Sequence, residues 1–301
     1  MIPSIEFHAG LPAFSALVYG AWRMADGADT SAQTALKKIQ LCLDMGITTF
    51  DHADIYGDYR CEALFGEALK LNPSLKHKMQ IVTKCGIKLI SARYPDRRVK
   101  HYDTSAAHIR YSVDNSLKLL GVDRLDTLLI HRPDPFMDAQ ETGACLDALV
   151  KEGKIAAAGV SNFSVSDFDV LQAAMQTKLV TNQLEISLLA QHTFLDGSLS
   201  QCQQHKIRPM AWSPLAGGSL FGDQEAAVRL RPALARIAQA HGTDIDAVAI
   251  AWLLAHPAGI VPVVGTNNLE RMARLGDALK IKLDRETWYE LWTLAAGKEV
   301  P

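Results

Sequence analysis

The stretch ITTFDHADIYG, residues 47–57, joins an apolar run to a cluster of polar side chains. Its first four residues are apolar or β-branched and lead to Asp51, which is typical of a short buried strand. The residues that follow include His52, Asp54 and Tyr56. Taken alone, these side chains are compatible with metal ligands, with acid and base groups, or with an ordinary polar loop after a strand. The rest of the chain has to decide between these interpretations.

Seven other apolar runs of similar length are spread along the 301 residues. Each is followed by a polar or glycine-rich loop and then by a segment with helical spacing, which is the pattern of βα units. Several runs are continuously apolar, as expected for parallel strands whose outer face is covered by helices. Eight such units without a linker predict one (β/α)8 TIM barrel domain over residues 1–301. The predicted strands are residues 15–20, 47–51, 80–85, 126–131, 155–160, 179–185, 207–212 and 259–264.

Capping residues mark the predicted helices between these strands. Thr30–Ser31, Ser166–Asp167 and Thr243–Asp244 stand where helix N-caps belong. Gly46 and Gly121 stand where C-caps belong. A doubly wound sheet is the competing architecture, but its G-x-G-x-x-G fingerprint after the first strand is missing.

Composition and charge exclude several classes of partner. The chain is 48% hydrophobic and 21% charged with a formal charge of -2, so it lacks the basic field that nucleic-acid binding needs. Its five cysteines form no C-x-x-C pair, and the odd number argues against a disulfide framework. The N-terminus does not resemble a secretory signal, and the most apolar segment, residues 248–255, is too short to span a bilayer. We therefore expect a cytoplasmic protein with no membrane or nucleic-acid partner.

Four chemically active side chains fall at the ends of predicted strands. In a TIM barrel the carboxyl ends of all strands face one mouth, so Asp51, Tyr56, Lys84 and His131 are expected to converge there. A buried lysine lowers the pKa of a neighbouring phenol, and an aspartate offsets the burial of that lysine. Tyr56 would then serve as a general acid, while His131 donates a hydrogen bond to the same substrate oxygen.

Each of these four residues also has a purely structural interpretation, such as an ion pair or a loop hydrogen bond, and only their combination favours catalysis. No nucleophile with a base is present, which disfavours acyl transfer. His52 and Asp54 are interpreted as loop residues beside the site. A metal site made of Asp51, His52 and His131 is the less favoured alternative because no His-x-His pattern supports it, and no metal is predicted.

Seven motifs together resemble those of the aldo-keto reductase superfamily, in family order and at family spacing. They are FDHADIYG, IVTKCG, LLIHRPD, GVSNF, NQLEIS, WSPLAGG and VPVVGTNNLERM. Members of this superfamily are (β/α)8 barrels that reduce carbonyls with NADPH. Within it, the chain is most similar to bacterial oxidoreductases related to the potassium-channel β-subunit branch. The resemblance covers essentially the whole chain, and it implies an NADP-dependent oxidoreductase that acts on a small-molecule carbonyl substrate.

The resemblance also implies roles for individual residues. It makes Tyr56 the proton donor, Lys84 and Asp51 its partners, and His131 the group that orients the carbonyl. The cofactor-binding residues that it implies are Gly20, Trp22, Asp51, Ser161, Asn162, Gln183, Trp212, Ser213, Pro214, Leu215, Gly217, Gly265, Thr266 and Arg271.

Among the cofactor-binding residues, the set formed by Ser161, Asn162 and Gln183 is expected to bind the nicotinamide carboxamide, and the ring of Trp212 to stack on the nicotinamide. The segment 213–217 is expected to follow the pyrophosphate, where small residues let backbone N–H groups approach phosphate.

The adenosine end of the cofactor is expected to meet Gly265, Thr266 and Arg271, of which Arg271 could engage a 2′-phosphate. Many relatives carry lysine in place of Gly265, which leaves the preference for NADPH over NADH to Thr266 and Arg271. Many also carry tyrosine in place of Trp212, a change that keeps a ring able to stack.

The substrate pocket is expected to lie between Trp22, Tyr56, His131 and the loops after the third and seventh strands. The first of these loops, residues 86–103, is basic; this is either a solvated surface or an attraction for anionic substrates. Small aldehydes or ketones are the expected substrates. Two other function classes stay open: a cofactor-binding module that senses redox state with little turnover, and a metal-dependent barrel hydrolase. Without a coiled-coil pattern, a monomer is the default expectation.

Overall fold

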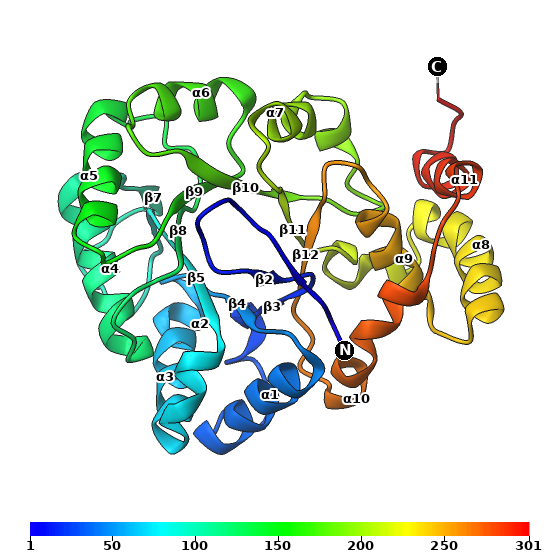
Figure 1. Ribbon diagram of the computed structural model, residues 1–301, viewed down its shortest axis with the longest axis horizontal. Helices are drawn as coiled ribbons and strands as arrows, with labels where there is room; N and C mark the ends of the chain where they lie inside the picture. The colour runs from blue at the N-terminus through cyan, green and yellow to red at the C-terminus, as the bar shows by residue number, and fades with distance from the viewer. Residues whose placement is uncertain (301) are drawn as a thin grey trace.

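The computed structural model describes residues 1–300, and Pro301, the last residue of the predicted domain, lies outside them. Eight parallel strands form a closed barrel in the order β3, β4, β5, β8, β9, β10, β11 and β12 (Figure 1). The strands are Val18–Gly20, Thr49–Asp51, Gln80–Cys85, Thr127–Ile130, Ala158–Ser161, Leu179–Glu185, Met210–Trp212 and Val261–Val264. Each overlaps one of the eight predicted runs, so the predicted (β/α)8 barrel is confirmed.

Helices surround this barrel on its outer side (Figure 1). The α-helices are α1 (Ala32–Met45), α2 (Tyr56–Tyr59), α3 (Cys61–Leu71), α4 (Ala106–Leu120), α5 (Ala139–Lys151), α6 (Val165–Ala173), α7 (Ser198–His205), α8 (Glu225–His241), α9 (Ile245–Leu254), α10 (Leu269–Arg274) and α11 (Arg285–Ala296). Short 3-10 helices are η1 (Ala21–Arg23), η2 (Pro73–Lys78), η3 (His192–Phe194), η4 (Ala216–Phe221) and η5 (Leu275–Lys280). No helix among the described residues is long and apolar enough to cross a membrane.

Two apolar cores hold these layers together. The larger one lies between the strands and the helices. The smaller one includes Val18, Val82, Leu129, Phe7 and Phe14. The phenyl rings of Phe7 and Phe14 stack 4.1 Å apart, and Phe14 belongs to the short N-terminal hairpin of β1 (Ser4–Ile5) and β2 (Phe14–Ser15). This hairpin lies across the barrel opening in Figure 1 and covers the amino ends of the strands, so chemistry is left to the opposite mouth.

Most predicted helix ends are found in the structure. Ser31 caps α1 by accepting a hydrogen bond from the backbone N–H of Thr34, and Gly46 ends this helix with a left-handed φ of 89°. The predicted cap Ser166–Asp167 of α6 is wrong. Ser164 is the N-cap, and its hydroxyl accepts a hydrogen bond from the backbone N–H of Asp167. The carboxylate of Asp167, at the third helical position, accepts from the backbone N–H of Ser164 and completes a capping box.

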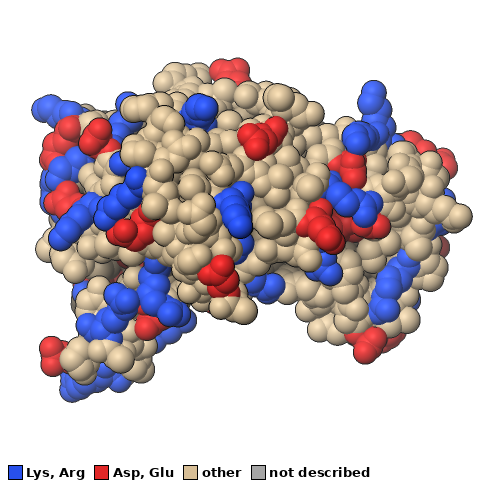
Figure 2. Space-filling view, turned by 90° about the horizontal axis from the view of Figure 1, so that it is seen from below, with Lys and Arg blue, Asp and Glu red and all other residues tan. Residues whose placement is uncertain are grey.

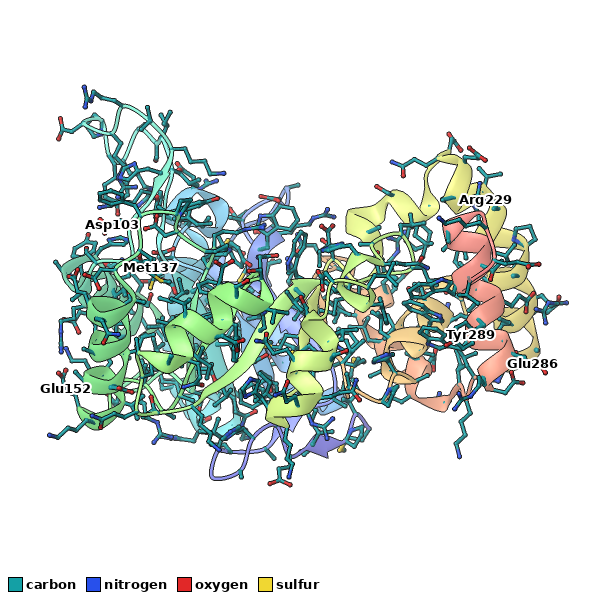
Figure 3. All side chains as sticks on the ribbon, turned by 90° about the horizontal axis from the view of Figure 1, so that it is seen from above. Asp103, Met137, Glu152, Arg229, Glu286 and Tyr289 are labelled. Carbon is teal, nitrogen blue, oxygen red and sulfur yellow. The ribbon has the colours of Figure 1, made fainter. Side chains whose placement is uncertain are left out.

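Three tryptophans fix the C-terminal helix. The indoles of Trp252 on α9 and Trp288 on α11 stack 4.7 Å apart, and each donates its N–H to the backbone carbonyl of the other at 3.0 Å. Trp292 packs at 5.5 Å from Trp288, measured between ring centroids. Arg229 of α8 donates to the carbonyl of Leu294 at 3.0 Å, so α8 and α11 lie side by side (Figures 1 and 3). Helix α11 is thereby joined to both helices that precede the last strand.

Candidate active site

A buried ion pair lies at the carboxyl ends of β4 and β5. The Nζ atom of Lys84 is 2.7 Å from Oδ2 of Asp51, and both side chains are almost completely buried. The same ammonium group donates to the hydroxyl of Tyr56 at 2.9 Å and to the backbone carbonyl of His52 at 2.8 Å. All three N–H donors of Lys84 are therefore used, which fixes this side chain in one position. The structure brings the predicted Asp51, Tyr56 and Lys84 together.

The charges in this cluster shift the pKa values of its members. Desolvation lowers the pKa of Lys84, but the attraction of Asp51 and the contact with Tyr56 outweigh it, so the pKa of Lys84 is raised and its charge is kept. For Tyr56, burial raises the pKa above its ordinary value, and Lys84 opposes this increase only in part. The expectation of a lowered phenol pKa is therefore wrong for this state of the protein. Tyr56 holds its proton at neutral pH, as a general acid must.

His131 stands over the phenol from the end of β8. Its ring meets the ring of Tyr56 edge-on, with the centroids 5.9 Å apart and the planes at 78°. Burial, assisted by the charges of Lys84, Arg132 and Lys100, lowers the pKa of His131 well below its ordinary value. The imidazole is therefore neutral at physiological pH, and it can offer a hydrogen bond without adding a charge.

His52 and Asp54 lie in the loop after β4, as predicted, and both are buried there. His52 is completely buried, its ring packs edge-on against Phe65 at 4.5 Å, and burial lowers the pKa of His52 to about 3. Asp54 accepts a hydrogen bond from Ser112 of α4 at 3.0 Å, and burial raises its pKa to about 8. The backbone carbonyl of His52 is a partner of Lys84, but neither the His52 ring nor the Asp54 carboxyl bonds to the Lys84 cluster. The nearby Glu62, which accepts from Thr83 at 2.6 Å, was not anticipated from the sequence.

A chain of hydrogen bonds connects Asp51 with the predicted carboxamide-binding residues. The amide nitrogen of Gln183 donates to Oδ1 of Asp51 at 2.9 Å, and the Ser161 hydroxyl donates to the Gln183 backbone carbonyl at 2.9 Å. The Asn162 side chain donates to the Ser161 hydroxyl at 2.8 Å. Trp212 donates its indole N–H to Oδ1 of Asn162 at 2.9 Å. The ends of β9, β10 and β11 thus share one polar row beside the ion pair.

Unusual backbone geometry is found in the loop after β11. Ser213, Ala216, Gly217 and Gly218 all have left-handed φ values, of 50°, 51°, 65° and 107°. A Cβ atom on Gly217 or Gly218 would meet no heavy atom within 4 Å, so the loop borders open space. Where several residues of one short loop are left-handed, their backbone N–H groups can point into a common concave surface that binds anions. Pro214 and Leu215 lie within this segment, so every predicted residue of the pyrophosphate loop is part of it.

Left-handed backbone at non-glycine residues is concentrated at the mouth of the barrel. The residues concerned are Asp58, Tyr59, Asn162, Lys206, Ser213 and Ala216. All except Lys206, which follows α7, lie in the connections after barrel strands, either in a loop or in the short helices α2 and η4. Such conformations cost about 1–3 kcal/mol each and persist where the surrounding structure enforces them, which is common at functional sites.

The loop after β12 is fixed by residues that the sequence did not single out. Lys38 of α1 donates to the Asn267 side chain at 2.8 Å, and Asn267 donates to the carbonyl of Arg23 at 2.5 Å. The guanidinium of Arg23 donates to the carbonyl of Gly217 at 3.1 Å. The loops after β3, β11 and β12 are therefore tied together around the mouth. Only long-range contacts reveal Lys38 and Arg23, because no local motif includes them.

The predicted residues at the ends of β3 and β12 lie around this junction. A Cβ atom on Gly20 would be 3.0 Å from Val263, which favours glycine at that site. Thr266 accepts a hydrogen bond from the backbone of Asn268 at 3.2 Å, beside the exposed Gly265. Arg271 is exposed on α10, where the Asn268 side chain caps its backbone.

The long basic loop after β5 is partly ordered by its own contacts. It contains a small antiparallel pair, β6 (Ile87–Lys88) and β7 (His101–Tyr102), and the segment between them projects away from the barrel (Figure 3). Arg97 donates to the hydroxyl of Tyr59 at 2.6 Å and lies over the ring of Tyr94 at 3.7 Å. Figure 2 shows lysine and arginine side chains gathered on this projection.

Among residues 1–300, no group of three or more His, Cys, Asp or Glu side chains is arranged to hold a metal ion. The five cysteines are free and buried. Trp22, on η1, is half exposed, and its place in a substrate pocket stays a prediction.

Comparison with known proteins identifies the family. The chain matches the model of the Aldo/keto reductase family over residues 16–295. It is 57% identical over 286 residues to a 6-dehydroglucose reductase of Agrobacterium fabrum, which covers 95% of this chain and 96% of that protein. The oxidoreductase YdhF of Escherichia coli is 44% identical over 302 residues, which is 100% of both proteins.

A solved structure gives the same result. The aldo-keto reductase from Klebsiella pneumoniae in complex with NADPH has a TM-score of 0.78 and 26% identity, over 100% of this chain and 96% of that one. The chain belongs to the aldo/keto reductase family and is an oxidoreductase, as its motifs predict.

Proposed function

We propose that this protein reduces aldehydes with NADPH and that Tyr56 donates the proton to the carbonyl oxygen. The observation that carries this proposal is the 2.9 Å hydrogen bond between the Tyr56 hydroxyl and the buried ammonium group of Lys84. A proton donor needs a group that stabilises the anion left behind, and Lys84 is a permanent positive charge in that position. NADPH, when bound, supplies the hydride that reduces the carbonyl carbon.

The remaining residues of the cluster position and stabilise these groups. Asp51 offsets the burial of the Lys84 charge, and it also accepts the hydrogen bond of Gln183, which links it to the nicotinamide-binding row. His131, held edge-on over Tyr56 and neutral, offers a second donor to the same carbonyl oxygen. Two donors that converge on one oxygen orient the carbonyl and stabilise the charge that develops on it.

The residues at the mouth fit a dinucleotide cofactor. The row formed by Ser161, Asn162 and Gln183 offers amide and hydroxyl groups for a carboxamide, and the Trp212 ring offers a flat surface for stacking. The left-handed loop that contains Gly217 offers backbone N–H groups for a pyrophosphate. The NADPH complex of the Klebsiella relative supports NADPH as this cofactor.

The substrate class follows from the relatives. The Agrobacterium protein that is 57% identical is named for the reduction of 6-dehydroglucose, a sugar that carries an aldehyde. We therefore propose a hydroxylated aldehyde as the substrate of this protein.

The test is the loss of NADPH absorbance at 340 nm with 6-dehydroglucose and a panel of simple aldehydes, for wild type and Tyr56→Phe. We expect turnover by wild type and a loss of about 10²–10⁴-fold in kcat for the variant, the range that general acid catalysis contributes. Both proteins should bind NADPH equally in equilibrium dialysis. Tyr289→Phe on α11 is the matched control, because Tyr289 is exposed far from the mouth (Figure 3). Normal NADPH binding without turnover by wild type would instead favour a redox-sensing module.

A further inference from the structure

A polar cavity lies beside the predicted nicotinamide-binding row. Its volume is about 390 Å³, and it is bordered by the ends of β9, β10 and β11. Asn162 and Trp212 form one side of it, and Arg132, Glu185 and Thr193 are among the residues that line the rest. The cavity is therefore adjacent to the residues assigned to the cofactor, but most of its lining is not explained by cofactor binding.

Several polar groups around this cavity have free hydrogen-bonding capacity. Within residues 1–300, neither the guanidinium of Arg132 nor the carboxylate of Glu185 forms a hydrogen bond or an ion pair, although both side chains are half-buried. The Thr193 hydroxyl is completely buried and also lacks a partner. Buried polar groups are normally hydrogen-bonded, so the half-buried Arg132 and Glu185, which the cavity can reach, are expected to bind a polar ligand.

Arg132 connects the cavity with the reacting group. It follows His131 directly in the chain, and its charge is close enough to contribute to the low pKa of His131. Its guanidinium carbon lies 5.6 Å from the centroid of the Trp212 ring, which borders the cavity. A substrate whose carbonyl oxygen meets Tyr56 and His131 could therefore extend past Arg132 into this space.

We propose that this cavity is the subsite for the hydroxyl groups of the substrate, with Arg132 and Glu185 as the residues that select hydroxylated over unsubstituted aldehydes. This inference rests on the proposed aldehyde reduction. A guanidinium only donates hydrogen bonds and a carboxylate only accepts them, whereas each hydroxyl does both, so a diol satisfies the two groups together. Glu185 and Asp196, which also lines the cavity, disfavour an anionic tail by like-charge repulsion.

An unsubstituted ring would leave these polar groups desolvated and unpaired, and sites built to bind a hydroxyl reject analogues that lack it. The test compares 6-dehydroglucose with cyclohexanecarbaldehyde, which places the aldehyde on a six-membered ring without hydroxyl groups. The readout is the ratio of the two kcat/KM values, because this ratio cancels any loss of reactivity common to both substrates.

We expect Arg132→Met to lower this ratio by about 10- to 100-fold, the effect of one hydrogen bond to a charged group. Glu185→Gln should lower the ratio of the two kcat/KM values as well. If circular dichroism shows that Arg132→Met folds poorly, this second variant still tests the subsite. Arg124→Met, at the amino end of β8, is the matched control and should keep the wild-type ratio.

An unchanged ratio in folded Arg132→Met and Glu185→Gln would overturn the subsite. A wild type that reduces cyclohexanecarbaldehyde but not 6-dehydroglucose would overturn it as well, while leaving aldehyde reduction intact. A wild type that reduces neither aldehyde would refute both the subsite and the proposed function.

Discussion

The guanidinium of Arg23 donates a hydrogen bond to the carbonyl of Gly217 at 3.1 Å, across 194 positions of the chain. Arg23 belongs to the loop after β3 and Gly217 to the left-handed loop after β11, so this bond joins two sides of the mouth. The loop that is proposed to bind the pyrophosphate borders open space at Gly217 and is held there by a residue outside it.

Replacing Arg23 by Met is expected to weaken NADPH binding about three- to tenfold, since a hydrogen bond of this kind contributes roughly 1 kcal/mol. The physical reason is that the loop must then be ordered by the cofactor alone. Equilibrium dialysis measures this change, with Arg285→Met on α11 as a control at an exposed site. Equal affinity of wild type and Arg23→Met would show that the contact does not contribute to cofactor binding.

Lys84→Met should destabilise the protein strongly, because it leaves the buried carboxylate of Asp51 without its partner. Breaking a buried ion pair in this way costs about 3–5 kcal/mol in the free energy of unfolding. Adding Asp51→Asn should recover part of this loss, because the uncompensated charge is then removed. Urea unfolding of the two single variants and the double variant measures the coupling, and a double variant no more stable than Lys84→Met would contradict the electrostatic explanation.

The buried carboxyl group of Asp54 is expected to make the free energy of unfolding depend on pH. Burial, together with the nearby Glu62, raises its pKa from 3.8 to about 8, so the folded protein favours the protonated form. The unfolded chain releases this proton near pH 4, and stability therefore falls as the pH rises from there through about 8. Asp54→Asn removes this pH dependence. The Tm of the variant minus the Tm of wild type should therefore be about 4 °C or more larger at pH 9 than at pH 5.

Thermal melts of wild type and Asp54→Asn between pH 5 and pH 9 check this expectation. Asp223→Asn is the control, because Asp223 is fully exposed and its replacement should leave the pH profile unchanged. Burial also raises the pKa of Glu62, to about 7, so Glu62 contributes a fall in stability with rising pH that wild type and both variants share. A constant difference between wild type and Asp54→Asn over this pH range would contradict the assigned pKa.

A side chain at Gly66 is expected to disturb the packing of helices on the outer side of the barrel. A Cβ atom at this residue of α3 would lie 1.9 Å from the backbone oxygen of Leu119 on α4, which cannot move without shifting the helix. Gly66→Ala should therefore cost about 1–3 kcal/mol despite the better helix propensity of alanine. Gly276→Ala, where the nearest atom is 3.8 Å away, is the control. Chemical denaturation of both variants measures the difference.

The barrel was predictable because most strand residues belong to short, largely apolar runs that become buried, and the strand ends of a parallel barrel share one mouth. This reasoning is enough to bring Asp51, Lys84 and His131 together. It does not reveal the N-terminal hairpin, whose strands of two residues each, Ser4–Ile5 and Phe14–Ser15, are too short to show a period.

Other features depend on contacts that no local pattern encodes. Asp54 and Glu62 look like ordinary polar residues, and only the packing of α3 and α4 onto the barrel buries them. The raised pKa of Tyr56 likewise follows from the degree of burial, whereas spacing suggested only the neighbour that lowers it. The role of Tyr56 as proton donor remains a prediction that Tyr56→Phe tests, and the roles of the cofactor-binding residues remain predictions.

The five tryptophans of the chain fall into two separate groups. Trp252, Trp288 and Trp292 are packed together between α9 and α11, whereas Trp22 and Trp212 stand at the mouth of the barrel. The intrinsic fluorescence of this protein therefore has two sources of different sensitivity. Emission from the mouth pair should be quenched when a nicotinamide ring approaches, while the packed trio supplies a steady background that changes only when the C-terminal helix detaches. One emission spectrum can thus follow ligand entry and local unfolding as distinct optical signals.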